Sequence, residues 1–87
     1  MNIENATEFI FRPLDGQTKL YISKDLQKLI DMNNHRLVGI YAVFKIGYTD
    51  ILMAMCWNKC GEPIVMSKFV DKLFFMHFYQ SWDVVNL

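Results

Sequence analysis

The stretch SKFVDKLFFMHFYQSW, residues 67–82, is the most apolar part of the chain and constrains how the rest can fold. Ser67 is a suitable N-cap, because its hydroxyl can accept a hydrogen bond from a free backbone N–H one turn into a helix. The spacing of apolar residues predicts a helix from there to Trp82, with two apolar stripes on its surface. The first stripe comprises Phe69, Leu73, Met76 and, at its edge, Val70; the second comprises Phe75, Phe78, Tyr79 and Trp82; Phe74 falls between them.

The second stripe raises the question of what covers it. One stripe can pack on the chain's own core, but each large apolar side chain left in water forfeits roughly 1.5–3 kcal/mol of burial free energy. Either two elements of the same domain flank the helix, or Phe75, Phe78, Tyr79 and Trp82 belong to a protein interface. A membrane role is disfavoured, because the run is far shorter than the ~20 apolar residues of a spanning helix and lacks a Lys/Arg-rich face.

Length and composition favour self-association or a tight partner. The 87 residues predict a single domain, 1–87, and a chain this short buries only about 60–65% of its unfolded surface. Yet 53% of the residues are hydrophobic and 15% are aromatic. That is more apolar material than a small domain readily hides, so we expect a homodimer or another protein partner.

The charge balance and the cysteines bear on partners and location. Nine basic and nine acidic residues give a formal net charge of zero, whereas nucleic-acid-binding proteins usually carry a basic excess. The start of the sequence, MNIENATEF, lacks the basic and apolar regions of an export signal. We therefore expect a cytoplasmic protein in which Cys56 and Cys60 are free thiols.

The remaining elements are short and closely spaced, with a turn signal at residues 13–16 and another at 58–61. The expected elements, in order, are strands at 8–12 and 18–22, a helix at 24–33 capped by Ser23, strands at 36–46, 50–57 and 62–66, and the final helix, followed by a short tail at 83–87 that can lie extended. Hairpin-length connections predict an α+β fold: a small antiparallel sheet of about four to five strands, ordered β-β-α-β-β-β-α, with two helices packed on it.

No constellation typical of catalysis, cofactor binding or metal binding stands out. Cys56 and Cys60 offer a single C-x3-C, whereas a structural zinc site needs four ligands, and His35 and His77 lie far away in sequence. A cysteine nucleophile needs an adjacent base, and nothing in the local sequence pairs His77 with Cys56. We therefore expect no enzyme activity, no cofactor and no metal.

The sequence thus predicts a small non-enzymatic module that binds another protein and inhibits or modulates it. Richness in Ile, Phe, Asn, Met and Lys is typical of AT-rich genomes, which include those of many bacteriophages and of low-GC bacteria. This association is compatible with a phage-encoded protein acting on a host factor. The alternative is a nucleic-acid-binding regulator that uses a basic face. The residues of that face would be Lys19, Lys24, Lys28 and Arg36.

Overall fold

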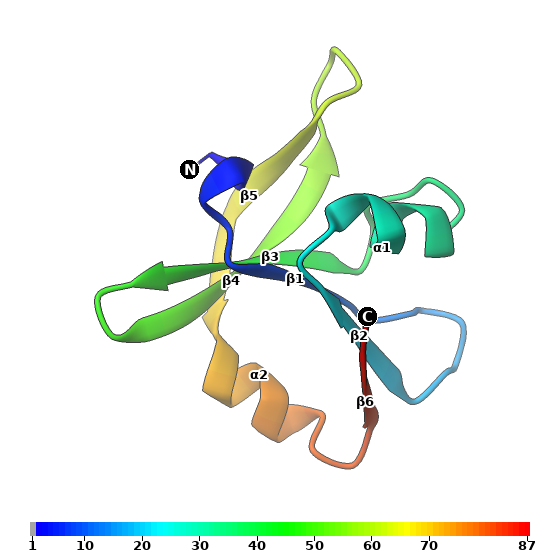
Figure 1. The fold of residues 1–87 in the computed structure, drawn as a ribbon, viewed down its shortest axis with the longest axis vertical. Helices are drawn as coiled ribbons and strands as arrows, with labels where there is room; N and C mark the ends of the chain where they lie inside the picture. The colour runs from blue at the N-terminus through cyan, green and yellow to red at the C-terminus, as the bar shows by residue number, and fades with distance from the viewer. Residues whose placement is uncertain (1) are drawn as a thin grey trace.

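The computed structural model describes residues 2–87. Within that range the chain forms six strands, two α-helices and one short 3-10 helix. In chain order the elements are η1 (Ile3–Asn5), β1 (Glu8–Phe11), β2 (Lys19–Ser23), α1 (Leu26–Met32), β3 (Ile40–Ile46), β4 (Thr49–Trp57), β5 (Pro63–Asp71), α2 (Lys72–Phe78) and β6 (Asp83–Asn86). Figure 1 shows α1 and α2 on different sides of the strands. The predicted small α+β fold with two helices packed on a sheet is therefore confirmed.

The strands form one open sheet in the order β5-β4-β3-β1-β2-β6. All neighbouring pairs are antiparallel except β2 and β6, which run parallel, with Lys19 opposite Asp83 and Ile22 opposite Asn86. The expectation of four to five antiparallel strands was wrong in these details, because the tail forms a sixth strand. A parallel neighbour needs a long crossover, and the chain supplies one by returning from β5 through α2 to the far edge of the sheet (Figure 1).

The final helix is much shorter than the sequence predicted. Residues 67–71 belong to β5, and α2 begins at Lys72, so Ser67 does not cap the helix. Its N-cap is Asp71, whose Oδ1 accepts hydrogen bonds from the backbone N–H groups of Leu73, at 2.7 Å, and Phe74, at 3.4 Å. Phe69 and Val70 pair with Met53 and Leu52 of β4, so they are strand residues.

Apolar residues are buried on both faces of the sheet. On the face covered by α1, Leu29 and Ile30 of that helix pack with strand residues that include Phe9, Phe11 and Phe44. On the opposite face, Phe75 of α2 packs with Ile10, Leu20, Val43 and Leu52. Successive strand residues point to opposite faces, which explains why Phe9 and Phe11 lie on one side and Ile10 on the other.

Two boundaries near α1 differ from the prediction for local reasons. Asp25, rather than Ser23, is the N-cap of α1; Ser23 ends β2, and its Oγ accepts a hydrogen bond from the Asp25 backbone N–H. Strand β3 begins at Ile40 instead of residue 36, because Gly39 has a φ of +85°, a conformation that favours glycine. A Cβ on Gly39 would lie 2.6 Å from the carbonyl oxygen of Arg12, so this position also requires the close approach that only glycine allows.

Candidate functional site

Helix α2 divides its side chains into two sets. At about 100° per residue, Leu73, Phe74, His77 and Phe78 share one continuous arc of about 140°. We call these four residues the outer face of α2. The residues between them in sequence, Phe75 and Met76, point the opposite way and pack on the sheet.

The inward side of α2 is built into the core. Phe75 is only 7% exposed, and Met76, Tyr79 and Trp82 are partly buried against the same cluster. The aromatic rings on this side, together with that of Tyr41 on β3, form a chain of contacts. The centroid distances are 5.2 Å for Tyr41–Phe75, 4.8 Å for Phe75–Tyr79 and 4.7 Å for Tyr79–Trp82. Tilted and edge-to-face ring pairs of this kind add stability beyond the area they bury.

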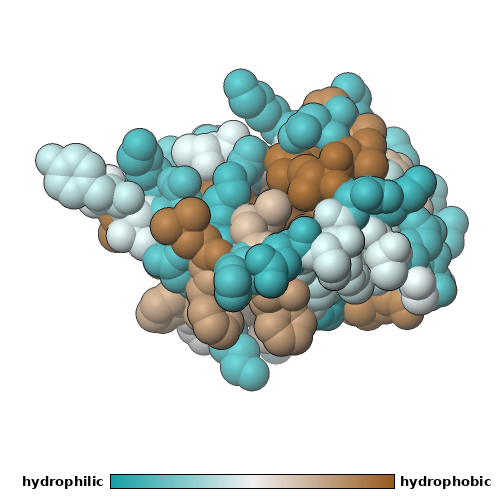
Figure 2. Space-filling model, turned by 90° about the horizontal axis from the view of Figure 1, so that it is seen from below, coloured by the Kyte–Doolittle hydropathy of each residue, from teal (hydrophilic) through white to brown (hydrophobic). Residues whose placement is uncertain are grey.

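The outer face of α2 carries three large apolar side chains that are mostly in water. Leu73 is 81% exposed, Phe74 is 64% exposed and Phe78 is 71% exposed. Figure 2 views the molecule from the side of α2 and shows apolar groups on this surface, interspersed with hydrophilic ones. Single exposed apolar residues are ordinary, but three on a two-turn helix form a patch of the kind that marks an interaction site.

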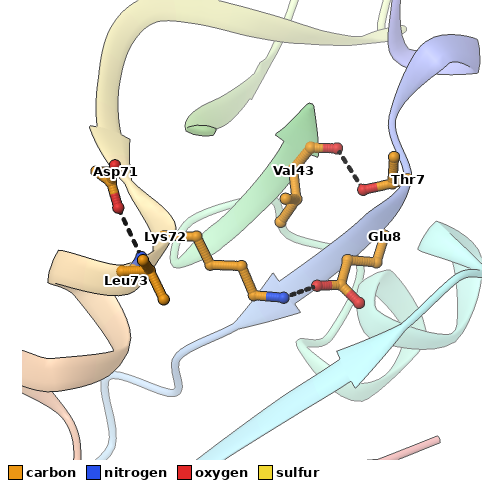
Figure 3. Close-up of polar contacts among 6 residues, drawn as sticks. All are labelled: Thr7, Glu8, Val43, Asp71, Lys72 and Leu73. Carbon is orange, nitrogen blue, oxygen red and sulfur yellow. Dashed lines mark hydrogen bonds and ion pairs between the residues drawn. The ribbon is translucent and has the colours of Figure 1, made fainter. Parts of the chain in front are cut away.

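The charged groups at the start of α2 are occupied within the chain. Lys72 Nζ forms an ion pair with the Glu8 carboxylate of β1, and the Asp71 carboxylate caps the helix (Figure 3). Neither charge is therefore free to surround the outer face of α2. The close-up also shows the Thr7 hydroxyl donating to the Val43 carbonyl oxygen, a bond that ties the residue before β1 to β3.

A second polar contact fixes the end of the helical segment. The Arg12 Nη1 group donates a hydrogen bond to the Tyr79 hydroxyl, and the guanidinium carbon lies 5.7 Å from the centroid of the Tyr79 ring. The hydrogen bond raises the pKa of Arg12 above its ordinary value, while partial burial acts in the opposite direction. Arg12 thus remains a cation, and it holds Tyr79 inward, against the sheet.

The structure brings the four predicted interface residues together but exposes only one of them fully. Phe78 lies on the outer face of α2 and contacts Tyr79 with a centroid distance of 4.9 Å. Phe75 belongs to the core, whereas Tyr79 and Trp82 are half-buried. Any interface here would therefore include Phe78 and parts of Tyr79 and Trp82, with little direct contact from Phe75.

Sequence reasoning missed Leu73 and Phe74 as surface residues. It placed Leu73 on the inward stripe with Phe69, because it extended the helix back to Ser67. Asp71 was an equally good N-cap in the sequence. A helix beginning after it contains neither Phe69 nor Val70, so no inward stripe would have grouped Leu73 with them. Phe69 is also exposed, at 68%, but it pairs with Met53 on the side of the sheet that α1 covers.

The four basic residues of the nucleic-acid alternative do not form one uninterrupted basic surface. Lys24 and Lys28 line a shallow hollow together, but Glu8 and Asp25 line it too. Arg36 lines a different hollow, beyond the other end of α1, and Lys19 stands opposite Asp83 in the β2–β6 pair. Carboxylates next to these lysines reduce the local attraction for phosphates.

The cysteines and histidines are dispersed among the described residues. Cys56 is half-buried on β4 and Cys60 is exposed in the following turn, and both are free thiols. His35 is exposed, and its Nδ1 lies 3.7 Å from Asp31 Oδ1. His77 belongs to the outer face of α2. Within residues 2–87, no group of three or more His, Cys, Asp or Glu side chains is arranged to hold a metal ion.

Comparisons with known proteins leave the family open. Neither the models of protein families nor the curated proteins nor the solved structures give a match to this chain. In the part of the chain that the structure describes, neither helix is long and apolar enough to cross a membrane.

Proposed function

We propose that the chain is a small non-enzymatic module that binds another protein through the outer face of α2 and thereby inhibits or modulates it. The observation that supports this proposal most directly is the exposure of Leu73, Phe74 and Phe78 on a helix whose opposite side packs on the sheet. A side chain on such a face lies mostly in water. Its burial free energy, roughly 1.5–3 kcal/mol for each large apolar group, becomes available to a partner.

The half-buried aromatic residues at the end of the helix fit the same role. Tyr79 and Trp82 pack on the sheet with one side and border the outer face of α2 with the other. Tyrosine and tryptophan are enriched among the residues that contribute most to binding energy. The amino-acid composition is typical of AT-rich genomes, which favours a bacteriophage origin. A host-cell protein is then the expected target and the host cytoplasm the expected location.

A capture experiment tests this proposal. The tagged protein and two variants, Phe78→Ser and Phe69→Ser, are incubated with bacterial extract, and retained proteins are identified by mass. Phe78 and Phe69 are equally exposed, at 71% and 68%, but lie on opposite sides of the sheet. We expect the parent and Phe69→Ser to retain the same protein and Phe78→Ser to lose it. Equal retention by all three proteins would contradict the assignment to the outer face of α2.

A further inference from the structure

The outer face of α2 carries no Asp, Glu, Lys or Arg, and His77 is its one polar residue. This composition restricts the partners that suit it. Leu73, Phe74 and Phe78 carry no charge, and the nearest charged groups of the helix, Asp71 and Lys72, are engaged by the helix cap and by Glu8 (Figure 3). A strongly acidic or basic partner would therefore find no matching charge there. A partner with an equally neutral and apolar face would lose no charge solvation on contact.

We propose that this partner is a second copy of the same chain, joined by antiparallel contact of the two α2 helices around a two-fold axis. This inference rests on the proposed function, because it concerns the same face. A second copy and a target protein would cover the same side chains, so the dimer and the target complex exclude each other. In an isologous contact, residue i of one copy meets residue j of the other, and j meets i. An axis through the second half of α2 places Phe78 of each copy against Leu73 and Phe74 of the other. The same register places His77 of each copy next to Phe74 of the other.

The available area is consistent with a weak, reversible dimer. A phenylalanine side chain buries about 150–250 Å² when fully covered, and Phe74 and Phe78 are 64% and 71% exposed. Together with Leu73, the face of one copy offers on the order of 400 Å² of apolar surface. Two copies therefore bury at most on the order of 800 Å² from these side chains, which is below the ~1,200 Å² of stable interfaces and in the range of weak, transient ones.

The overall charge and the other edges of the molecule favour the same arrangement. A formal net charge of zero leaves no long-range repulsion between copies. The main alternative for self-association is the outer edge of β5, since long edge strands can pair with another chain. That strand is irregular, with a register shift relative to β4 between Met53 and Met55, and it carries Lys68. Irregularities and lysines both oppose edge-to-edge pairing.

Sedimentation equilibrium over a range of concentrations tests the inference. We expect a reversible monomer–dimer equilibrium in the parent and a dissociation constant at least tenfold higher in Phe78→Ser. Phe69→Ser is the matched control and should dimerise like the parent. A parent that stays monomeric at all concentrations would overturn the second-copy inference alone, because the capture experiment assesses the proposed function separately. Loss of the dimer in Phe69→Ser would also overturn it.

A mixing experiment tests the antiparallel geometry. Phe74→Lys and Phe78→Glu should each be monomeric on their own, because each places a charge against an apolar partner. In an equimolar mixture, a mixed dimer has two contacts. One contact joins the Phe74→Lys site to the Phe78→Glu site, where opposite charges attract, and the other joins the unchanged Phe78 and Phe74. We therefore expect the mixture to recover dimer. If the mixture forms no dimer although circular dichroism shows that each variant is folded, the antiparallel contact is overturned.

Discussion

Helices α1 and α2 have the same length, seven residues each, yet they present very different surfaces to water. Each packs on one face of the sheet and begins with an aspartate N-cap, Asp25 or Asp71. The outward side of α1 is mostly polar, with Gln27, Lys28 and Asp31 exposed, whereas that of α2 carries Leu73, Phe74 and Phe78. The difference indicates that α1 serves to complete the core, while α2 completes the core and also offers a contact surface.

The largest expected effects on the free energy of unfolding come from the buried core beneath each helix. Phe44 lies under α1 and Leu52 lies under α2, and each is 1% exposed. Phe44→Ala should lower the free energy of unfolding by about 3–5 kcal/mol and Leu52→Ala by about 2–5 kcal/mol. Urea denaturation followed by circular dichroism measures both. An unchanged midpoint in either variant would contradict the assignment of that face as core.

The next prediction separates the two sides of α2. Phe75→Ala removes a ring from the core and should lower the free energy of unfolding by about 3–5 kcal/mol. Phe78→Ala removes an exposed ring and should change the unfolding free energy of the monomer by no more than about 0.5 kcal/mol. Both are measured by thermal or urea unfolding at a concentration where the protein is monomeric. Equal losses would remove the distinction between an inner and an outer face.

A smaller effect tests the shared capping chemistry. Asp71→Ala removes the acceptor for the N–H groups of Leu73 and Phe74, and Asp25→Ala removes the acceptor for Gln27. Each should lower the free energy of unfolding by about 1 kcal/mol. Asn is as good an N-cap as Asp, so Asp71→Asn and Asp25→Asn should keep most of the stability. Similar losses in the Asn and Ala variants would point to charge effects in place of capping.

The smallest effect is expected on the polar side of α1. Lys24→Gln combined with Lys28→Gln should change stability by no more than about 0.5 kcal/mol and leave the dimer and the captured partner unaltered. Fluorescence anisotropy with a single-stranded RNA oligonucleotide, at low and at moderate salt, tests the alternative function. Salt-sensitive binding that these substitutions weaken would favour a nucleic-acid-binding role and make α1 a functional surface as well.

Much of the fold followed from local pattern. Alternating residues at 8–12, the turn at 13–16 and the return at 18–22 correctly predicted the β1–β2 hairpin, and the apolar run at 50–57 correctly predicted β4 at an inner position of the sheet. The parallel pairing of β6 with β2 could not be predicted, because it joins segments far apart in sequence and leaves no local signal. It depends on where α2 directs the chain.

The error at residues 67–71 has a specific cause and affected the candidate site directly. Phe69 and Val70 fit a helical stripe with Leu73 and Met76, yet both residue types also favour strands. Pairing with Met53 and Leu52 of β4 decided between the two structures, and the sequence does not reveal that pairing. Phe78 was predicted as an interface residue and is exposed; Phe75 shared its stripe, but in the folded chain it lies in the core.

Helix α2 connects β5 and β6, the two edge strands of the sheet, and this position bears on the thermodynamics of association. The helix follows β5 directly and is joined to β6 by a short turn, while Lys72 and Tyr79 bind β1 and Arg12 at its two ends. Its backbone therefore has little freedom left to lose when a partner arrives. Ordering of loops and side chains is a major cost of binding. The fold has already ordered the backbone of α2, so the remaining ordering cost comes mainly from the exposed side chains of the patch.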